Sequence, residues 1–269
     1  MLKITKVDIE KIHSCYLGPG ISPEHLIPEH YFMYLLQGTY IAYDGEKKYI
    51  SNPGDAIIAR KNHLIRYTKN KVDNEFHKIV IALDEPFLRS FLEKHPYRPG
   101  VFDNDDSILL VETNALVRNF VNSLEPYYKG AEKLDPDFAD VKREELLIIL
   151  LKQNPAWAQV FFNFSIPQRI DLAAFMNKNF RFNIKLEQFA FLTGRSLSTF
   201  KRDFNKIFNE MPGTWLTRKR LEEAHFQIKN KNKKPGDIYL EVGFENLSHF
   251  SYAFKKQFGK SPVEVQKAE

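Results

Sequence analysis

The most informative part of the sequence is EVGFENLSHFSYAFKKQFGKSP, residues 241–262. Its phenylalanines recur every three or four residues, which is the spacing of one face of an α-helix. A relative lies fifty positions upstream: LSTFKRDFNKIF at 197–208 aligns with LSHFSYAFKKQF at 247–258 and is identical to it at six of twelve positions. This duplication indicates two copies of one structural unit.

Each copy is predicted to contain a short helix, a turn opened by glycine and a longer helix. Upstream of the long helices the copies align with an offset of 49, so that Gly194 matches Gly243 and the second turn is one residue longer. A glycine suits a turn position that requires a positive φ. The pattern is that of helix-turn-helix motifs, at about 186–208 and 237–258.

Projecting each longer helix at about 100° per residue separates two faces. One face gathers the phenylalanines with Leu197, Ile207, Leu247 and Ala253, and we expect it to form core. The other carries Ser198, Thr199, Arg202, Asn205 and Lys206 in the first copy, with Lys201 at the margin, and Ser248, His249, Tyr252, Lys255 and Lys256 in the second. Such faces are often simply solvated. Here the duplication, the positive charge and the hydrogen-bonding side chains favour contact with DNA bases and phosphates.

The segment between the copies, residues 212–230, has apolar residues at helical spacing behind Pro212. A helix of roughly 16 residues would span about 24 Å. Such a rod could hold two recognition helices in successive major grooves, about 34 Å apart. After the second copy, Ser261 and Glu264 form a capping signature that predicts a terminal helix.

Charge is distributed unevenly along the 269 residues. Residues 166–269 contain 19 Lys and Arg against 11 Asp and Glu, a net charge of +8, whereas residues 1–165 carry a net charge of −3. The asymmetry indicates that the C-terminal part meets a polyanion. Ordinary surface solubility is the alternative explanation.

The N-terminal part is predicted to be rich in strands and then in helices. Short β-branched and aromatic runs separated by turns cover about 29–83 and favour a small antiparallel barrel or sandwich. Helical spacing follows around 85–95, 107–129 and 137–153, within a helical region of about 85–163. The predicted fold is therefore α+β with two domains, 1–165 and 166–269. The apolar excess of the 137–153 helix predicts a dimer, and a filled barrel core is favoured over a pocket.

The sequence lacks the motifs of several kinds of binding site and active site. Cys15 is the single cysteine, which excludes an internal disulfide and a multi-cysteine zinc site. His63 and His77 stand on different segments, so no metal site and no cofactor are predicted. No phosphate loop or nucleophile elbow appears. The N-terminus lacks the apolar region of a signal peptide and the longest apolar run, LLIILL at 146–151, is too short to span a membrane, so the cytosol is expected.

With these residues in hand, residues 170–266 resemble the AraC/XylS family of bacterial transcription regulators. The later part of the signature reads as Asp237-Ile238, Glu241-Val242-Gly243-Phe244, Phe250, Phe254-Lys255-Lys256, Phe258-Gly259 and Ser261-Pro262. The earlier part reads as Leu186, Phe189-Ala190, Gly194, Ser198, Phe200-Lys201-Arg202, Phe204, Arg220-Leu221 and Ala224. The chain departs from the family at Tyr239, where Ala is common, and at Tyr252 and Gln266, where Arg is common.

The resemblance implies base-edge candidates Ser198, Lys201 and Arg202, then Ser248, His249 and Tyr252. Thr199, Asn205, Lys206, Lys255 and Lys256 are left as phosphate candidates. Because Tyr252 stands in place of Arg, the first motif is expected to be the better reader. The family also implies a cupin-like sensor domain followed by dimerising helices.

The expected partners are double-stranded DNA, RNA polymerase, a second copy of the chain, and a small-molecule or protein effector. The expected function is that of a sequence-specific regulator, an activator, and not an enzyme. The alternative is a cupin-like small-molecule-binding protein or enzyme with a degenerate helical appendage, which metal analysis would reveal.

Overall fold

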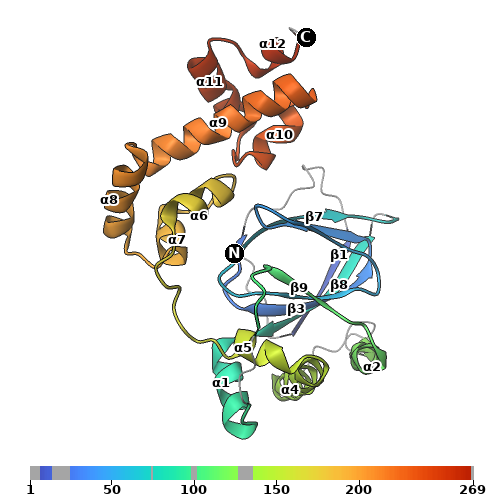
Figure 1. Ribbon diagram of the computed structural model, residues 1–269. Helices are drawn as coiled ribbons and strands as arrows, with labels where there is room; N and C mark the ends of the chain where they lie inside the picture. Colours follow the sequence, from blue (N-terminus) through green and yellow to red (C-terminus); the bar gives the residue numbers. More distant parts are fainter. Residues whose placement is uncertain (1–6, 14–24, 74, 98–101, 127–135, 268–269) are drawn as a thin grey trace. The chain divides into compact units, whose positions relative to one another are not determined.

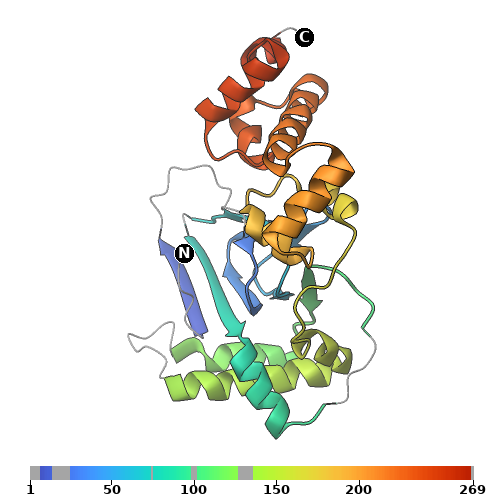
Figure 2. The ribbon, with the colours of Figure 1, turned by 90° about the vertical axis from the view of Figure 1, so that its left-hand side faces the viewer.

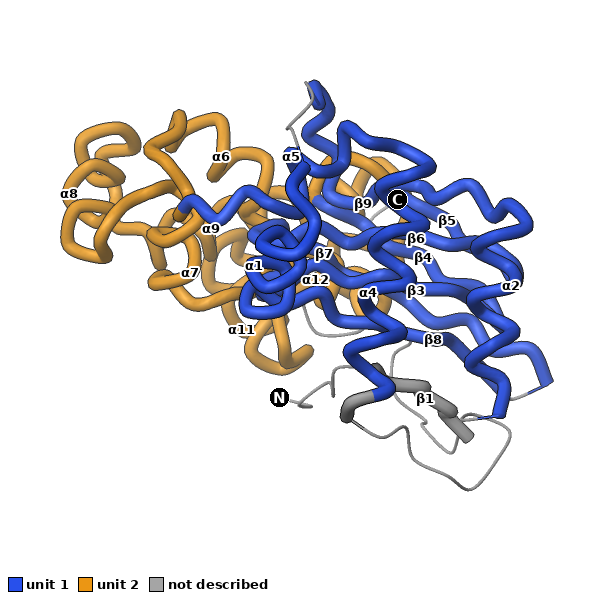
Figure 3. Tube along the Cα trace, turned by 90° about the horizontal axis from the view of Figure 1, so that it is seen from below, with its two compact units in different colours: residues 1–20, 26–44, 48–165 blue, residues 21–25, 45–47, 166–269 orange. Residues whose placement is uncertain are grey.

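The computed structural model describes residues 7–13, 25–73, 75–97, 102–126 and 136–267. The chain divides into two compact units, which Figure 3 colours separately. The N-terminal unit comprises residues 1–20, 26–44 and 48–165, and the C-terminal unit comprises residues 21–25, 45–47 and 166–269. Cys15, on which the disulfide argument depends, lies outside the described residues.

The N-terminal unit is built on two antiparallel sheets. Sheet A has the order β1 (Val7–His13), β8 (Glu75–Leu83), β3 (His30–Gln37), β6 (Ala56–Ala59) and β9 (Ile108–Val111). Sheet B has the order β2 (His25–Leu26), β7 (Leu64–Asn70), β4 (Thr39–Tyr43) and β5 (Lys48–Ser51). The antiparallel strands expected between 29 and 83 are confirmed. The helix expected from residue 107 is wrong at its start, because Ile108–Val111 pairs with β6 as an edge strand.

Strand β3 packs on both of its faces, and alternation along it assigns each residue to a face. Met33 and Leu35 point toward sheet B, where they pack with Tyr40 and Ala42 of β4. Phe32 points the other way, into the layer of helices. The sequence left open which residues of 31–36 point inward, and the structure places the odd-numbered ones between the sheets.

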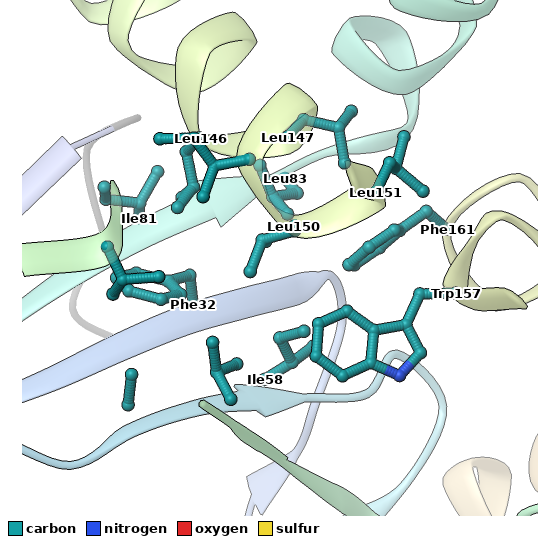
Figure 4. Close-up of a cluster of buried hydrophobic side chains, with 14 of the residues drawn as sticks. Phe32, Ile58, Ile81, Leu83, Leu146, Leu147, Leu150, Leu151, Trp157 and Phe161 are labelled. Atoms are coloured by element: carbon teal, nitrogen blue, oxygen red, sulfur yellow. The ribbon is translucent and has the colours of Figure 1, made fainter. Parts of the chain in front are cut away.

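Helices cover the outer face of sheet A (Figure 1). They are α1 (Glu85–Lys94), α2 (Ala115–Ser123), α4 (Pro136–Gln153) and α5 (Ala158–Phe161), with the short 3₁₀ helix η1 (Pro155–Trp157) before α5. Leucines of α4 lie over Phe32, Ile58 and Ile81 of the sheet (Figure 4). The run at 146–151 packs into the unit's own core. The exposed apolar residues of α4 are instead Phe138 and Val141.

From residue 166 on, the elements of the C-terminal unit are helices organised around one long helix (Figures 1 and 2). Its elements are α6 (Leu172–Asn179), α7 (Leu186–Leu192), α8 (Leu197–Phe208), α9 (Pro212–Lys231), α10 (Pro235–Glu241), α11 (Leu247–Phe258) and α12 (Pro262–Lys267). Helix α9 has 20 residues and is therefore about 30 Å long, longer than predicted. Its N-terminal half supports α6 to α8, and its C-terminal half supports α10 to α12.

Each half of α9 carries its own aromatic core. In the first, Trp215 packs edge-on against Phe204, with ring centroids 5.5 Å apart, and against Phe208 at 4.7 Å. In the second, Phe250 and Phe254 pack with Ala224 and Ile228, which lie in the C-terminal half of α9. The phenylalanines of the duplicated pattern are core, as predicted, and the two motifs share one rigid support.

The duplication extends to the ends of the helices. The longer helices α8 and α11 begin at the N-caps Ser196 and Asn246, fifty residues apart. They end at Asn209 and Gly259, both in the left-handed conformation, and Pro212 and Pro262 then start the next helices. Two assignments to the core face are wrong, since Ile207 is 49% exposed and Leu247 is 42% exposed. Ile207 lies at the edge of its apolar stripe, and Leu247 is the first residue of α11.

Candidate nucleic-acid interface

The two turns of the helix-turn-helix motifs require glycine. Gly194 has a φ of 64° and Gly243 a φ of 96°, in the region that favours glycine. A Cβ atom on Gly194 would lie 2.5 Å from the backbone nitrogen of Arg169, and one on Gly243 would lie 2.5 Å from the carbonyl oxygen of Arg181. Each turn is therefore pressed against another segment of the unit, which fixes the helix that follows.

The first recognition helix, α8, presents most of its predicted residues to solvent. Ser198, Arg202, Asn205 and Lys206 are exposed, whereas Thr199 and Lys201 are half-buried. The Thr199 hydroxyl accepts a hydrogen bond of 3.0 Å from the N-cap Ser196, which ties it to the start of the helix. Ser198 and Arg202 lie in the N-terminal half of α8, where a helix in the major groove meets bases, and Asn205 and Lys206 follow on the same side.

Asp203 is the single acidic residue of α8, and arginines surround it. The Arg195 side chain is 7% exposed and donates to Asp203 over 3.3 Å. Arg169 pairs with the same carboxylate, and Arg202 reaches its other oxygen over 3.4 Å. Desolvation opposes ionisation of this carboxyl, but the Arg195 hydrogen bond and the charges of Arg169 and Arg202 outweigh it and lower the pKa of Asp203. The cluster therefore carries a net positive charge beside the reading face.

The second recognition helix, α11, contains no acidic residue. Its predicted residues Ser248, His249, Tyr252, Lys255 and Lys256 are all exposed, Tyr252 to 70%. The N-cap Asn246 accepts hydrogen bonds of 2.8 and 3.1 Å from the backbone nitrogens of Ser248 and His249. The face offers hydroxyl, imidazole and ammonium groups and no repulsive carboxylate.

Arg220 joins the two motifs at the middle of α9. Its side chain donates to the carbonyl oxygens of Phe180, over 2.8 Å, and Phe182, over 2.7 Å, in the turn that follows α6. A Cβ on Gly243 of the second motif would lie 2.8 Å from its Nε atom. In the same place Asn183 donates to Glu245 over 2.7 Å. The turn after α6 is thus wedged between α9 and the second motif, which sets how the two recognition helices are oriented.

The terminal helix α12 begins as predicted. Ser261 donates from its backbone nitrogen to Glu264 over 2.6 Å, and its hydroxyl accepts from the Glu264 nitrogen over 3.3 Å. These bonds form a capping box. The backbone hydrogen bond from Ser261 lowers the pKa of Glu264.

Sequence reasoning missed Arg169, Arg195 and Asp203. The available signal was Asp203 itself, one acidic residue within an otherwise basic recognition helix. Such a carboxylate is expected to pair with a basic side chain. Its partner Arg169 is 34 positions away and precedes α6, so no local periodicity connects the two residues.

Across the described parts of the chain, no three His, Cys, Asp or Glu side chains are grouped so that they could hold a metal ion. His63 contacts the Lys61 carbonyl oxygen at 2.9 Å, and His77 lies 3.6 Å from Glu75. None of the helices within the described ranges is both long and apolar enough to cross a membrane.

Comparison with known proteins covers both units. The family described as the ExsA N-terminal regulatory domain matches residues 30–159, and a helix-turn-helix domain family matches residues 189–268. The transcriptional regulator ExsA of Pseudomonas aeruginosa is 25% identical over 94% of this chain and 91% of its own length. The chain belongs to the AraC/XylS family of transcriptional regulators. A further relative is the virulence regulon transcriptional activator VirF of Yersinia enterocolitica, 29% identical over 86% of this chain and 87% of VirF.

The search of solved structures gives a weaker likeness. A crystal structure of an apo ToxT variant from Vibrio cholerae has a TM-score of 0.47 at 12% identity, covering 98% of each chain. As a member of the AraC/XylS family, this protein is a DNA-binding transcriptional regulator with an N-terminal regulatory domain.

Proposed function

We propose that this AraC/XylS-family regulator binds double-stranded DNA by laying α8 and α11 in successive major grooves. Ser198, Lys201, Arg202, Ser248, His249 and Tyr252 are the proposed base-edge contacts. Thr199, Asn205, Lys206, Lys255 and Lys256 are the proposed phosphate contacts. Arg202 has the strongest assignment, because a guanidinium can donate two hydrogen bonds to one guanine.

One observation carries this proposal. The 20-residue helix α9 supports two exposed helix faces, and neither face has an acidic side chain whose charge is left uncompensated. Asp203 is the only carboxylate on either recognition helix, and arginines neutralise it. The rod's length of about 30 Å approaches the spacing of one DNA turn. A purely solvated face does not explain why the two helices carry one acidic side chain between them and why arginines compensate its charge.

The proposal is tested by the salt dependence of binding. The wild-type affinity for a DNA sequence selected from a random pool should fall steeply with salt concentration, because phosphate contacts release counterions. Replacing Lys255 and Lys256 by Gln should reduce the slope of log K against log salt by roughly 2. The matched control replaces Lys229 and Lys231, exposed at the end of α9, and should leave the slope unchanged. Equal effects of the two double variants would contradict the interface.

For the N-terminal part we propose a sensor and dimerisation domain spanning 1–165, with the DNA-binding domain at 166–269. Phe138 and Val141 support a homodimer through the start of α4, since they are 57% and 62% exposed and lie three residues apart. Sedimentation at micromolar concentration should give a dimer. Replacing both residues by Ser should yield monomer, whereas Ile50→Ser, at an exposed strand position, should not. A wild-type monomer would contradict the proposal.

We further propose that the N-terminal domain responds to an effector, a small molecule or a protein, and that the bound regulator contacts RNA polymerase and activates transcription in the cytoplasm. The match to a regulatory domain family supports a regulatory role for this domain in preference to a catalytic one. A cupin-like enzyme would instead contain a metal or turn over a substrate. Metal analysis of the purified protein distinguishes the two, and a stoichiometric metal would favour the enzyme.

A further inference from the structure

The six residues that precede α6, 166–171, pack against the turn of the first helix-turn-helix motif. A Cβ on Gly194 would lie 2.5 Å from the backbone nitrogen of Arg169 and 2.6 Å from the carbonyl oxygen of Gln168. Arg195 donates to the carbonyl oxygen of Ile170 over 3.1 Å. This segment therefore has a defined place on the motif.

Arg195 makes the segment, the turn and the recognition helix into one block. Besides Ile170 it donates to the carbonyl oxygen of Thr193 over 2.7 Å and to Asp203 of α8 over 3.3 Å. Its side chain is 7% exposed, so the Arg195 guanidinium has a structural role and is not accessible to DNA. Arg169 reaches Asp203 from the adjacent segment, yet its side chain is 63% exposed.

We propose that Arg169 is a phosphate-binding residue of the DNA interface, supplied by the segment in front of α6 at the flank of α8. The inference rests on the proposed function of α8. It adds a contact from outside both helix-turn-helix motifs.

The position of Asp203 on the helix carries the argument. At about 100° per residue, Asp203 is rotated about 100° from Arg202, on the side of Thr199 and Lys206. When a helix lies in the major groove, its centre faces base edges, and its flanks face the two sugar–phosphate backbones. An arginine pinned to Asp203 therefore stands at a backbone, with part of its guanidinium in solvent.

Charge and geometry agree with a phosphate ligand. One carboxylate receives Arg169, Arg195 and Arg202, which leaves the cluster with a formal charge of +2. A guanidinium that shares one edge with a carboxylate keeps other N–H groups for a phosphate oxygen, because it has five donors. Pinning by Asp203 reduces the side-chain entropy lost on binding.

The test compares Arg169→Gln and Arg169→Lys with wild type in full-length protein, on the selected DNA and on a scrambled duplex. Arg169→Gln should weaken binding about fivefold to tenfold on both duplexes and lower the salt slope by about 0.9. Arg169→Lys should keep the slope, because the charge remains. Lys229→Gln is the control for loss of one exposed positive charge and should change neither quantity.

A structural role for Arg169 makes a different prediction. If Arg169→Gln lowers the thermal unfolding midpoint but leaves the salt slope at the wild-type value, the phosphate contact is overturned. Loss of preference at one base pair would overturn it too, since that assigns the residue to a base. Wild-type protein that fails to bind any duplex would instead contradict the proposed function.

Discussion

Arg202 is the residue on which reading of the DNA sequence most depends. Its side chain is 65% exposed, and its contact with Asp203 is long, at 3.4 Å. It can therefore turn toward a base without giving up a strong ion pair. Arg202→Ala should cost specific binding roughly 1–3 kcal/mol and relax the preference at one base pair. Competition binding against all single-base variants of the selected site measures this, and a uniform loss would reassign Arg202 to phosphate.

His30 gives the N-terminal unit a pH dependence. Burial, together with the charges of Arg60, Lys61 and His63, lowers the pKa of His30 to about 3 from 6.5. Between those values the unfolded chain binds a proton that the folded chain does not. Stability is therefore complete above about pH 6.5 and falls as the pH drops, by up to about 1.4 kcal/mol per pH unit from this residue.

The measurement is urea unfolding at pH 7.5, 6.5 and 5.5 for wild type and His30→Asn. The amide oxygen of Asn can still accept the hydrogen bond that Lys61 donates to His30 Nδ1 over 3.2 Å. The wild type should lose more stability than the variant over this range. Equal losses would mean that His30 does not contribute, and that His63, whose pKa burial also lowers, dominates.

At the residue scale, periodicity predicted which side chains face outward but not how they are held. The exposure of Arg202, Ser248 and Lys256 follows from the helical projection alone. The Asp203 cluster does not, since it needs Arg169 brought next to α8 by tertiary packing. Ile207 was misplaced because it lies at the edge of its apolar stripe, and Leu247 because it is the first residue of α11. At both kinds of position local packing decides exposure.

At the scale of single elements, the glycine turns have a sharp test. Gly243→Ala places a methyl group 2.5 Å from the Arg181 carbonyl oxygen at a φ of 96°. It should lower the free energy of unfolding by more than about 1 kcal/mol. Gly213→Ala, near the start of α9 with no atom within 4 Å of the new Cβ, should stabilise by about 0.5–1 kcal/mol. Thermal unfolding of both variants measures this, and similar effects would refute the packing of the turn.

Helices and strands could be predicted where the sequence pattern was long, and the prediction failed where the pattern was short. The duplicated helices with their glycines, and the strands of 31–83, could be assigned from periodicity and turn residues. The four-residue strand β9 was taken for part of a helix, because the run ILLV is too short to show a helix or strand periodicity. Its pairing with β6 is what makes this segment a strand. The apolar run of α4 was recognised, but its destination, the unit's own sheet, depends on tertiary structure.

At the scale of the whole C-terminal unit, Arg220 links the two motifs. Arg220→Met keeps the bulk of the side chain in α9 but removes the donors to Phe180 and Phe182. The two recognition helices should then lose their fixed orientation relative to each other. Affinity for a DNA with both half-sites should fall at least about tenfold, while affinity for one half-site changes little. Anisotropy titrations on the two duplexes give this ratio, and equal losses on both would reduce Arg220 to a stabilising residue.

Two motifs on one long helix should contact DNA at two places one helical turn apart. The purified protein is used to select sequences from random DNA, and contacts on the selected site are mapped by methylation interference at guanine N7 in the major groove. We expect interference in two clusters one helical turn apart, with the cluster facing α8 the more sequence-restricted. A single cluster, or binding without sequence preference even at low salt, would contradict the placement of α8 and α11 in successive major grooves.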